Sequence, residues 1–242
     1  MAVISQADQS GYDRESLSSE EENQLRVTLE RSLEDTRTEG TTTLRDKVEE
    51  YYDEIVFAAE VARAQFDQRF DGQNPASGFF GIDTIHSGYF GYDDWTNTPD
   101  AGADDGGTAI AWLDDEAPDH LSGNGGRDHP LRVGEDVVHV ILGVGSYEEE
   151  PNATRLRFVK NDSPRSAFST TEYFRNTDLH IQWLNAPIVL ADGDDIYSEY
   201  LAAEDDSDES LYLKGLTFIK EKTSRVMTPE TMAAEDLFEE TS

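Results

Sequence analysis

The chain has 242 residues, of which 52 are Asp or Glu and only 19 are Lys or Arg, so its formal net charge is −33. Repulsion among these carboxylates opposes a compact state in dilute buffer, whereas at about 1 M salt the Debye length falls to roughly 3 Å and that cost largely disappears. The charge balance predicts a protein adapted to molar salt, and it argues against binding to nucleic acid or anionic membranes, which needs clustered basic residues.

The rest of the composition predicts a soluble globular chain without disulfides. It contains no cysteine, and aromatic residues make up 10% of it, enough to supply a core. No apolar run approaches the roughly 18 residues that a membrane-spanning helix needs. The segment Met1–Gln6 lacks the basic and apolar regions of a signal peptide. We therefore expect synthesis in a cytoplasm and no membrane insertion.

The pattern of the first 71 residues predicts helices. The first predicted helix has a clear start. Ser18 and Glu21 have the spacing of a capping box, in which each side chain bonds the other residue's exposed amide. Leu25, Leu29 and Leu33 follow at steps of four residues, which predicts a narrow apolar stripe on a short helix.

A second, longer helix is expected from Thr42 or Thr43 to about Phe70, a length of about 42 Å at 1.5 Å per residue. Its apolar residues recur at steps of four and three along one side: Leu44, Val48, Tyr51, Ile55, Ala59, Ala62 and Phe66. This helical stripe needs a cover, which is either the preceding helix or the β-rich part of the chain, or a neighbouring subunit. We predict that these seven residues contact another subunit or a partner.

Residues 71–78 predict a hinge, because Gly, Asn and Pro cluster there. Runs of strand type follow: Phe79–Ile85, Tyr89–Trp95, Thr108–Leu113, Asp136–Tyr147, Thr154–Lys160, Phe168–Phe174, Leu179–Leu190, Asp195–Leu201 and Leu211–Lys220. About eight short strands without helices between them predict a mainly β sandwich or barrel rather than a βαβ fold. The predicted organisation is a helical arm at 1–71, a β-sandwich domain at 72–222 and an acidic tail at 223–242.

Three single-residue features predict local irregularities. The apolar residues of the last run change faces at Gly215, which predicts a β-bulge there. Pro187 either places the run Leu179–Leu190 at a sheet edge or divides it in two. In the tail, Thr228 followed by Pro229 has the pattern of a helix start, which predicts a short C-terminal helix.

No motif in the sequence has the spacing of a catalytic or transition-metal site. The histidines show neither an i, i+4 pair nor the H-x-H pair of a metal-binding cupin barrel; they are His86, His120, His129, His139 and His180. The chain has no cysteine nucleophile and no G-x-S-x-G elbow. Adjacent carboxylates do not indicate a catalytic acid–base pair here, because such neighbours are common in so acidic a chain. We therefore expect no enzyme activity and no cofactor beyond structural cations.

Two groups of residues leave a binding role open. Asp192, Asp194 and Asp195 form a dense oxygen cluster of the kind that holds a hard structural cation, and the alternative is a solvated acidic loop. Aromatic residues in strand-type runs belong to the core or, alternatively, form a sugar-binding platform. Those considered are Trp95, Trp112, Trp183 and Tyr89–Tyr92.

The second half of the chain carries a resemblance. Residues 185–196, Asn-Ala-Pro-Ile-Val-Leu-Ala-Asp-Gly-Asp-Asp-Ile, lead into a strand, a polar loop follows at 204–210, and the run at 211–218 closes the fold. This pattern, over residues 130–222, resembles the last strands of jelly-roll domains in viral capsid and decoration proteins. Together with the acidity, it resembles virion structural proteins of viruses that infect haloarchaea.

The resemblance implies a jelly-roll-like β-sandwich of about eight strands in a capsid, turret, decoration or neck component, with no catalytic residues. It implies location in the virion after synthesis in the host cytoplasm, with other virion proteins as partners. The helical stripe also predicts a homo-oligomer, because symmetric self-assembly commonly buries such an apolar surface. The alternative is a halophilic β-sandwich or cupin-like enzyme, or a carbohydrate-binding module.

Overall fold

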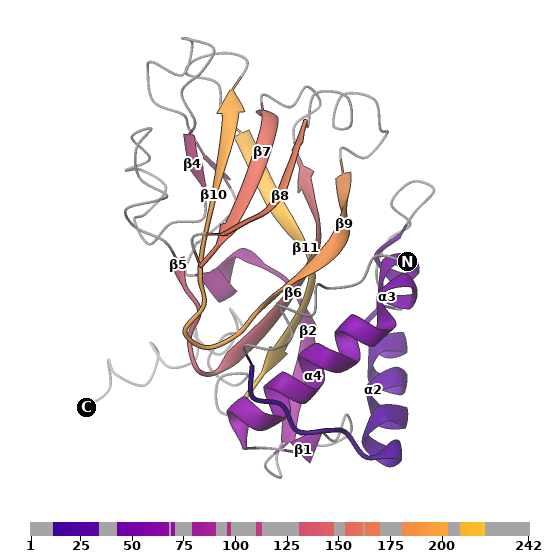
Figure 1. Ribbon diagram of the computed structural model, residues 1–242. Coiled ribbons are helices and arrows are strands. Elements are labelled where there is room, and N and C mark those ends of the chain that lie inside the picture. Colours follow the sequence, from indigo (N-terminus) through magenta and orange to yellow (C-terminus); the bar gives the residue numbers. More distant parts are fainter. Residues whose placement is uncertain are drawn as a thin grey trace, which may run out of the picture.

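The computed structural model describes residues 12–33, 43–67, 69–70, 79–90, 96–97, 110–112, 131–147, 153–161, 163–169, 181–202 and 209–220. These residues form a mainly β protein, in which helices precede two antiparallel sheets (Figure 1). The helices are α2 (Ser19–Ser32), α3 (Leu44–Glu50) and α4 (Tyr52–Phe66). None of the helices in the described part of the chain is long and apolar enough to span a membrane.

The first sheet has the strand order β1-β2-β11-β6-β9, and β3 also pairs with β11. Its strands are β1 (Arg69–Phe70), β2 (Phe79–Thr84), β3 (Thr96–Asn97), β6 (Val137–Ser146), β9 (Ile181–Leu190) and β11 (Glu209–Ile219). All of these pairs are antiparallel except the short parallel pair β1–β2. A 3₁₀ helix, η2 (Ser87–Phe90), follows β2 where the sequence predicts the start of a strand.

The second sheet has the order β4-β10-β7-β8, and β5 also pairs with β10. Its strands are β4 (Ile110–Trp112), β5 (Leu131–Arg132), β7 (Ala153–Lys160), β8 (Ser163–Ser169) and β10 (Asp195–Ala202). Strand β8 starts five residues earlier than the predicted run at 168–174. The reason is a tight turn directly after Lys160, where Asn161 adopts the left-handed conformation, with φ 49°, that hairpin turns require.

The two sheets enclose one apolar core, as expected for a β-sandwich. Ile141 of β6 and Leu213 of β11 come from the first sheet, and Phe158 of β7 and Ile196 of β10 come from the second. The prediction of a mainly β fold with two sheets is confirmed.

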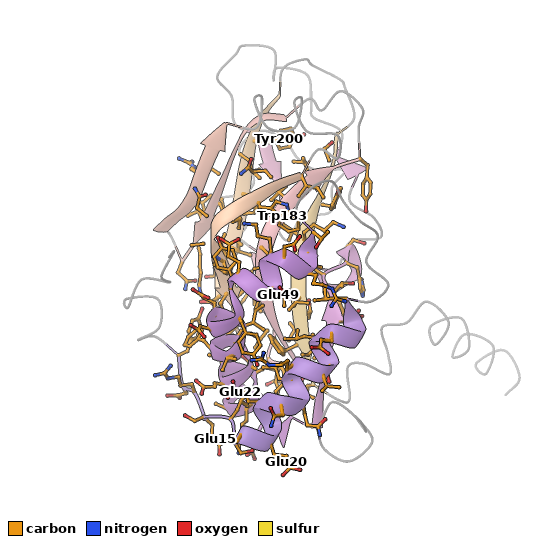
Figure 2. All side chains as sticks on the ribbon, turned by 90° about the vertical axis from the view of Figure 1, so that its right-hand side faces the viewer. Glu15, Glu20, Glu22, Glu49, Trp183 and Tyr200 are labelled. Carbon is orange, nitrogen blue, oxygen red and sulfur yellow. The ribbon has the colours of Figure 1, made fainter. Side chains whose placement is uncertain are left out.

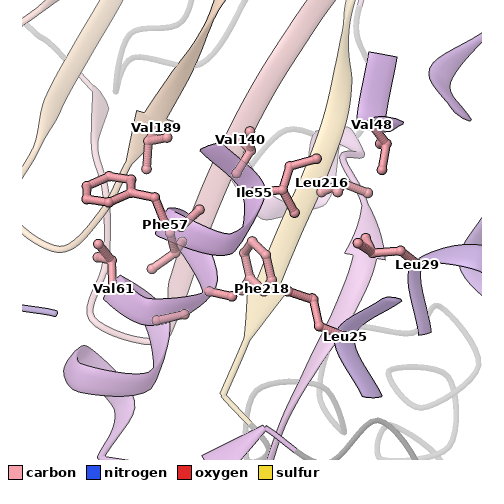
Figure 3. Close-up of a cluster of buried hydrophobic side chains, with 14 of the residues drawn as sticks. Leu25, Leu29, Val48, Ile55, Phe57, Val61, Val140, Val189, Leu216 and Phe218 are labelled. Carbon is pink, nitrogen blue, oxygen red and sulfur yellow. The ribbon is translucent and has the colours of Figure 1, made fainter. Parts of the chain in front are cut away.

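The helices pack on the other face of the first sheet (Figures 1 and 3). Leu25 of α2 and Ile55 of α4 lie in one cluster with Val140 of β6 and Phe218 of β11, and all four side chains are buried. Every residue of β6 is buried, and Val138, Val140 and Leu142 of this strand pack in the same cluster as the helices. The helices are therefore a third layer of the same folded unit, and not a separate arm.

The helical stripe is covered within the chain. Its seven residues, Leu44, Val48, Tyr51, Ile55, Ala59, Ala62 and Phe66, are each at most 4% exposed. They pack with α2 and with β2, β6, β9 and β11. The prediction that they contact a neighbouring subunit is wrong, because the strands of the same chain already exclude water from them. The structure instead agrees with the alternative, in which the stripe packs on the preceding helix and on the β-rich part of the chain.

Helix boundaries follow the predicted caps but not the predicted length. Ser18 and Glu21 form the predicted capping box, with Ser18 N donating to Glu21 Oε2 at 2.9 Å. Thr43 caps α3 in the same way through Asp46. The predicted long helix is interrupted at Tyr51, where φ is −110° and ψ is 30°, and α4 ends at Phe66.

The predicted bulge at Gly215 is present. The pairing of β11 with β6 shifts between Lys214 and Gly215, so that Leu142 of β6 has no opposite residue. A Cβ at Gly215 would lie 1.9 Å from the carbonyl oxygen of Val140, so only glycine lets the two backbones approach this closely.

Pro187 lies in an edge strand, and the pairing also breaks beside it. Strand β9 is the last strand of its sheet, and its register with β6 jumps from Ile188 to Trp183. Inside this break, the carbonyl oxygen of Leu184 accepts a hydrogen bond of 3.1 Å from the hydroxyl of Tyr51. Burial, together with the nearby charge of Glu50, raises the pKa of Tyr51 to about 12. A residue of the helical stripe thus bonds a carbonyl group that the sheet leaves unpaired.

Some predictions concern residues outside the described part of the chain. The hinge at 71–78, the tail at 223–242 and the C-terminal helix at Thr228 are among them. The strand predicted at Tyr89–Trp95 is described only to Phe90, which is part of η2.

Candidate functional site

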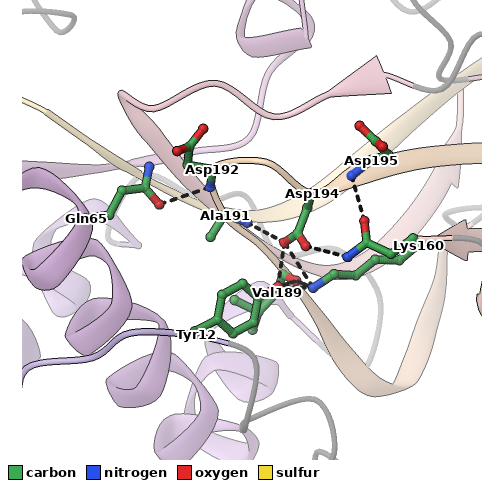
Figure 4. Close-up of polar contacts among 9 residues, drawn as sticks. Tyr12, Gln65, Lys160, Val189, Ala191, Asp192, Asp194 and Asp195 are labelled. Carbon is green, nitrogen blue, oxygen red and sulfur yellow. Dashed lines mark hydrogen bonds and ion pairs between the residues drawn. The ribbon is translucent and has the colours of Figure 1, made fainter.

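The predicted cation cluster lies where β9 turns into β10, and its central carboxylate is already fully bonded (Figure 4). Asp194 is buried. Its Oδ2 accepts hydrogen bonds from the backbone amide of Ala191 at 2.8 Å and from the Tyr12 hydroxyl, and its Oδ1 accepts one from Asn161 Nδ2 at 2.7 Å. The Nζ of Lys160 lies 3.0 Å from Oδ2.

Lys160 supplies the positive charge that a metal ion would otherwise bring. Its side chain is 7% exposed, at the end of β7, and its Nζ also donates to the carbonyl oxygen of Val189 at 2.7 Å and to the Tyr12 hydroxyl. A buried ion pair is tolerated only when further hydrogen bonds satisfy both groups, and these contacts do so. We call Tyr12, Lys160, Asn161 and Asp194 the ionic network.

The two other aspartates of the cluster take no part in this pairing. The side chain of Asp192 is exposed, and its backbone amide donates to Gln65 Oε1 of α4 at 3.0 Å. The backbone amide of Asp195 donates to Asn161 Oδ1 at 2.8 Å. Across the described residues, no three His, Asp or Glu side chains gather in a way that could hold a metal ion. The prediction of a cation at Asp192, Asp194 and Asp195 is therefore wrong.

The ionic network joins three parts of the fold. Lys160 belongs to the second sheet, Val189 belongs to the first, and Tyr12 belongs to the segment that leads into α2. That segment runs along α4, where Arg63 bonds Glu21 at 2.7 Å and the backbone oxygen of Ser16 at 3.0 Å. The arrangement fixes the helical layer and both sheets to one another, which is a structural role.

His139 of β6 forms the second buried polar cluster. It is 1% exposed, its Nδ1 lies 2.9 Å from the Thr217 hydroxyl oxygen, and the Phe90 ring stacks on it at 4.6 Å. Burial, and then the nearby His86, lower the pKa of His139 to about 3. The imidazole therefore stays uncharged near neutral pH. A neutral ring enclosed by Phe90 and Thr217 is a packed core residue, and its pKa does not suit general acid–base chemistry near neutrality.

The other predicted histidines and aromatic residues have different outcomes. The ring centres of His86 and Tyr89 lie 3.8 Å apart with an angle of 34° between the ring planes, and the Tyr89 hydroxyl donates to Asp83 at 2.8 Å. Trp183 lies on β9 and is half-buried. Trp112 ends β4, and nothing is described of its side chain. His120, His129, His180, Trp95 and Tyr92 lie outside the described residues.

Two glycines of β6 lie directly against aromatic rings of the neighbouring strands. A Cβ at Gly143 would lie 2.8 Å from Cε3 of Trp183, and a Cβ at Gly145 would lie 2.2 Å from Cζ of Tyr212. The ring centres of Tyr147 and Tyr212 lie 4.2 Å apart with an angle of 33° between the ring planes; Tyr212 is buried and Tyr147 is exposed. The sequence did contain a signal for this arrangement, since glycines at alternate positions of a strand indicate close approach by other groups.

Comparisons with known proteins identify no family. No protein-family model matches the chain, and no curated protein matches it. Among solved structures, it is similar to the crystal structure of Podospora anserina GH26-CBM35 β-(1,4)-mannanase, with 10% identity and a TM-score of 0.27. That match covers 57% of this chain but only 27% of the mannanase chain. A likeness this weak carries no argument about function.

Proposed function

We propose that this protein is a structural component of a haloarchaeal virus particle, a capsid, decoration, turret or neck protein that acts through subunit contacts and not through catalysis. The observation that carries the proposal is the order of the strands, which supports a jelly roll. The eight strands that would make up the jelly roll are β2, β4, β6, β7, β8, β9, β10 and β11.

The first sheet contains β2-β11-β6-β9 and the second contains β4-β10-β7-β8. Along the chain, these strands change sheets at every step except from β7 to β8. A jelly roll is two four-stranded sheets joined by such crossings, and viral capsid domains are among the proteins built on it. Lectin domains and cupins share the architecture, so the strand order alone does not select among them.

The acidity favours the virion among these choices. A particle in molar salt must keep its outer surface hydrated, and a formal charge of −33 provides carboxylates for that. Contacts with neighbouring subunits then have to use surfaces other than the helical stripe, which is buried in this chain. We expect a homo-oligomer that also contacts other virion proteins.

Mass spectrometry of purified particles tests the proposal. For a haloarchaeal virus whose genome encodes this chain, we expect a fixed, stoichiometric copy number in particles that keep it through a density gradient. Light scattering in about 3 M KCl, where surface repulsion is screened, is expected to give a closed oligomer. Absence from the particles would contradict the proposal and would favour the alternative, a halophilic enzyme or carbohydrate-binding module of the host.

A further inference from the structure

The short helix η2 lies over a buried histidine of the first sheet. Val138 and Val140 of β6 pack with the helices, so His139 between them faces the sandwich core, as Ile141 does. The helices cover the opposite face of this sheet and lie in front of its strands in Figure 2. They therefore do not enclose the imidazole of His139, and another element has to do so.

A row of four residues crosses the strands on the sandwich face. The register places Asp83 of β2 opposite Thr217 of β11, Thr217 opposite His139, and His139 opposite Leu190 of β9. Residues that lie opposite each other share a face of a sheet. His139 Nδ1 lies 2.9 Å from the Thr217 hydroxyl oxygen, so the two middle side chains of the row bond each other.

Two side chains of η2 hold it across this row. The Tyr89 hydroxyl donates to the Asp83 carboxylate at 2.8 Å, and the Phe90 ring stacks on the imidazole of His139 with 4.6 Å between the ring centres. The Tyr89 amide closes the turn by donating to the carbonyl oxygen of His86 at 3.2 Å. Because η2 has four residues, which is too short to be stable alone, these contacts keep it in place.

The groups around His139 give a positive charge there no partner. Thr217, Leu190 and Phe90 carry no charge, and burial raises the pKa of the Tyr89 hydroxyl above its usual range, so it is neutral as well. His86, directly before η2, is near enough to disfavour a charge on His139. The carboxylate of the row, Asp83, is two strands or roughly 10 Å away. Once η2 moves off, water replaces the Phe90 ring and solvates the imidazolium.

We propose that η2 is a pH-sensitive plug, which opens away from the sheet when His139 is protonated. Burial, and then the nearby His86, lower the pKa of His139 to about 3 in the closed form, whereas an exposed histidine has a pKa near 6.5. The open form therefore binds a proton first as the pH falls, and opening is favoured about tenfold for each pH unit below 6.5. The plug does not rest on the virion proposal, and either can fail without the other.

Hydrogen exchange of the full chain in about 3 M KCl, at pH 7.5 and pH 5, measures the opening by mass spectrometry of peptides from η2 and from β6. After correction for intrinsic exchange, the η2 amides are expected to exchange about thirtyfold faster at pH 5. At both pH values they are expected to exchange at least about tenfold faster than the β6 amides, because η2 opens without the sheet. Equal exchange in the two peptides would overturn the proposal, and this comparison needs only the natural chain.

His139→Gln removes the titrating group, and its η2 exchange is expected to differ by less than about threefold between the two pH values. His86→Gln is the matched control, because it removes the neighbouring imidazole but keeps His139, and it is expected to retain at least about a tenfold difference. Each variant is compared with itself, so a general loss of stability does not affect the result. A pH difference that persists in His139→Gln, or that disappears in His86→Gln, would contradict the plug.

Discussion

Strand β6 separates two cores that differ in how far apart their residues lie in the sequence. On one face, the helical stripe and α2 pack onto the sheet, and most of the helical contribution comes from residues 44–66. On the other face, the core is assembled mainly from strands β6 to β11 of both sheets, which span residues 137–219, together with Ile85, Phe90 and Val133. The first core has a local pattern, whereas the second exists only after distant strands have met.

The two cores are also joined differently. The helix–sheet core is almost entirely apolar, while its link to the second sheet is the ionic network, in which Lys160, Asp194 and Tyr12 meet. Not all charged residues of this chain serve to hydrate its surface. One buried pair holds the layers in register, and its removal is expected to disturb both cores together.

Lys160→Met has the largest expected effect. It leaves the buried Asp194 carboxylate without its cation, which costs about 3–5 kcal/mol of unfolding free energy. The measurement is urea denaturation in about 3 M KCl. Lys220→Met is the matched control, because its pair with Asp136 is partly exposed at 27% and 43%, and its loss is expected to stay below about 1 kcal/mol. Equal losses in the two variants would show that burial of the pair is unimportant.

A cavity in either core tests whether the cores unfold together. Ile55→Ala opens one in the helix–sheet core and Leu156→Ala opens one in the sandwich core, and both residues are at most 1% exposed. Each variant is expected to lose about 2–5 kcal/mol. Far-UV circular dichroism, which reports the helices, and tryptophan fluorescence are expected to give a single midpoint in both variants. Separate midpoints in Leu156→Ala would mean that the helical layer is a unit of its own.

Gly215→Ala tests the close contact of β11 with β6. Its Cβ would collide with the Val140 carbonyl group, so the strands must move apart at a cost of about 1–3 kcal/mol. Gly81→Ala, on β2 of the same sheet, has no atom within 4 Å of the new Cβ and is expected to change stability by less than about 0.5 kcal/mol. Thermal melts of the two variants side by side provide the check, and equal melting temperatures would contradict the bulge geometry.

The pH dependence of stability reports on His139. Its pKa is about 3 when folded and near 6.5 when unfolded, so the unfolded state gains a proton first as the pH falls below 6.5. The native state is expected to lose about 2 kcal/mol between pH 7.5 and pH 5 from this residue. His139→Gln lacks the titration, so its stability is expected to fall less over the same range. Parallel curves for the two proteins would rule out a buried neutral histidine as the cause.

Much of the local structure follows from short-range patterns. The capping boxes at Ser18 and Thr43, the bulge at Gly215 and the edge position of the Pro187 strand follow from single residues whose backbone demands are the same in any fold. The spacing of the helical stripe predicts correctly which residues are buried. It does not predict what buries them, because a stripe has the same period whether strands of its own chain or another subunit cover it.

Short-range patterns predicted the candidate sites less well. Asp194 was predicted to be a cation ligand from the acidic residues around it, yet its partner Lys160 lies 34 positions earlier, and Tyr12 lies even farther away. Likewise, Trp183 and Tyr212 are ordinary strand residues in the sequence, and they lie against the same strand only because β9 and β11 both flank β6.

By itself, the sequence determined the strongly acidic charge balance, the mainly β composition with helices first, and the local caps and irregularities. Charge, hydrophobic period and backbone preference are properties of the residues themselves. Only the tertiary structure decided the order of strands in the two sheets, the internal cover of the helical stripe, the Lys160–Asp194 pair and the packing of the Trp183 and Tyr212 rings against the glycines of β6. Each of these depends on groups far apart in the chain, which meet only when the whole core closes.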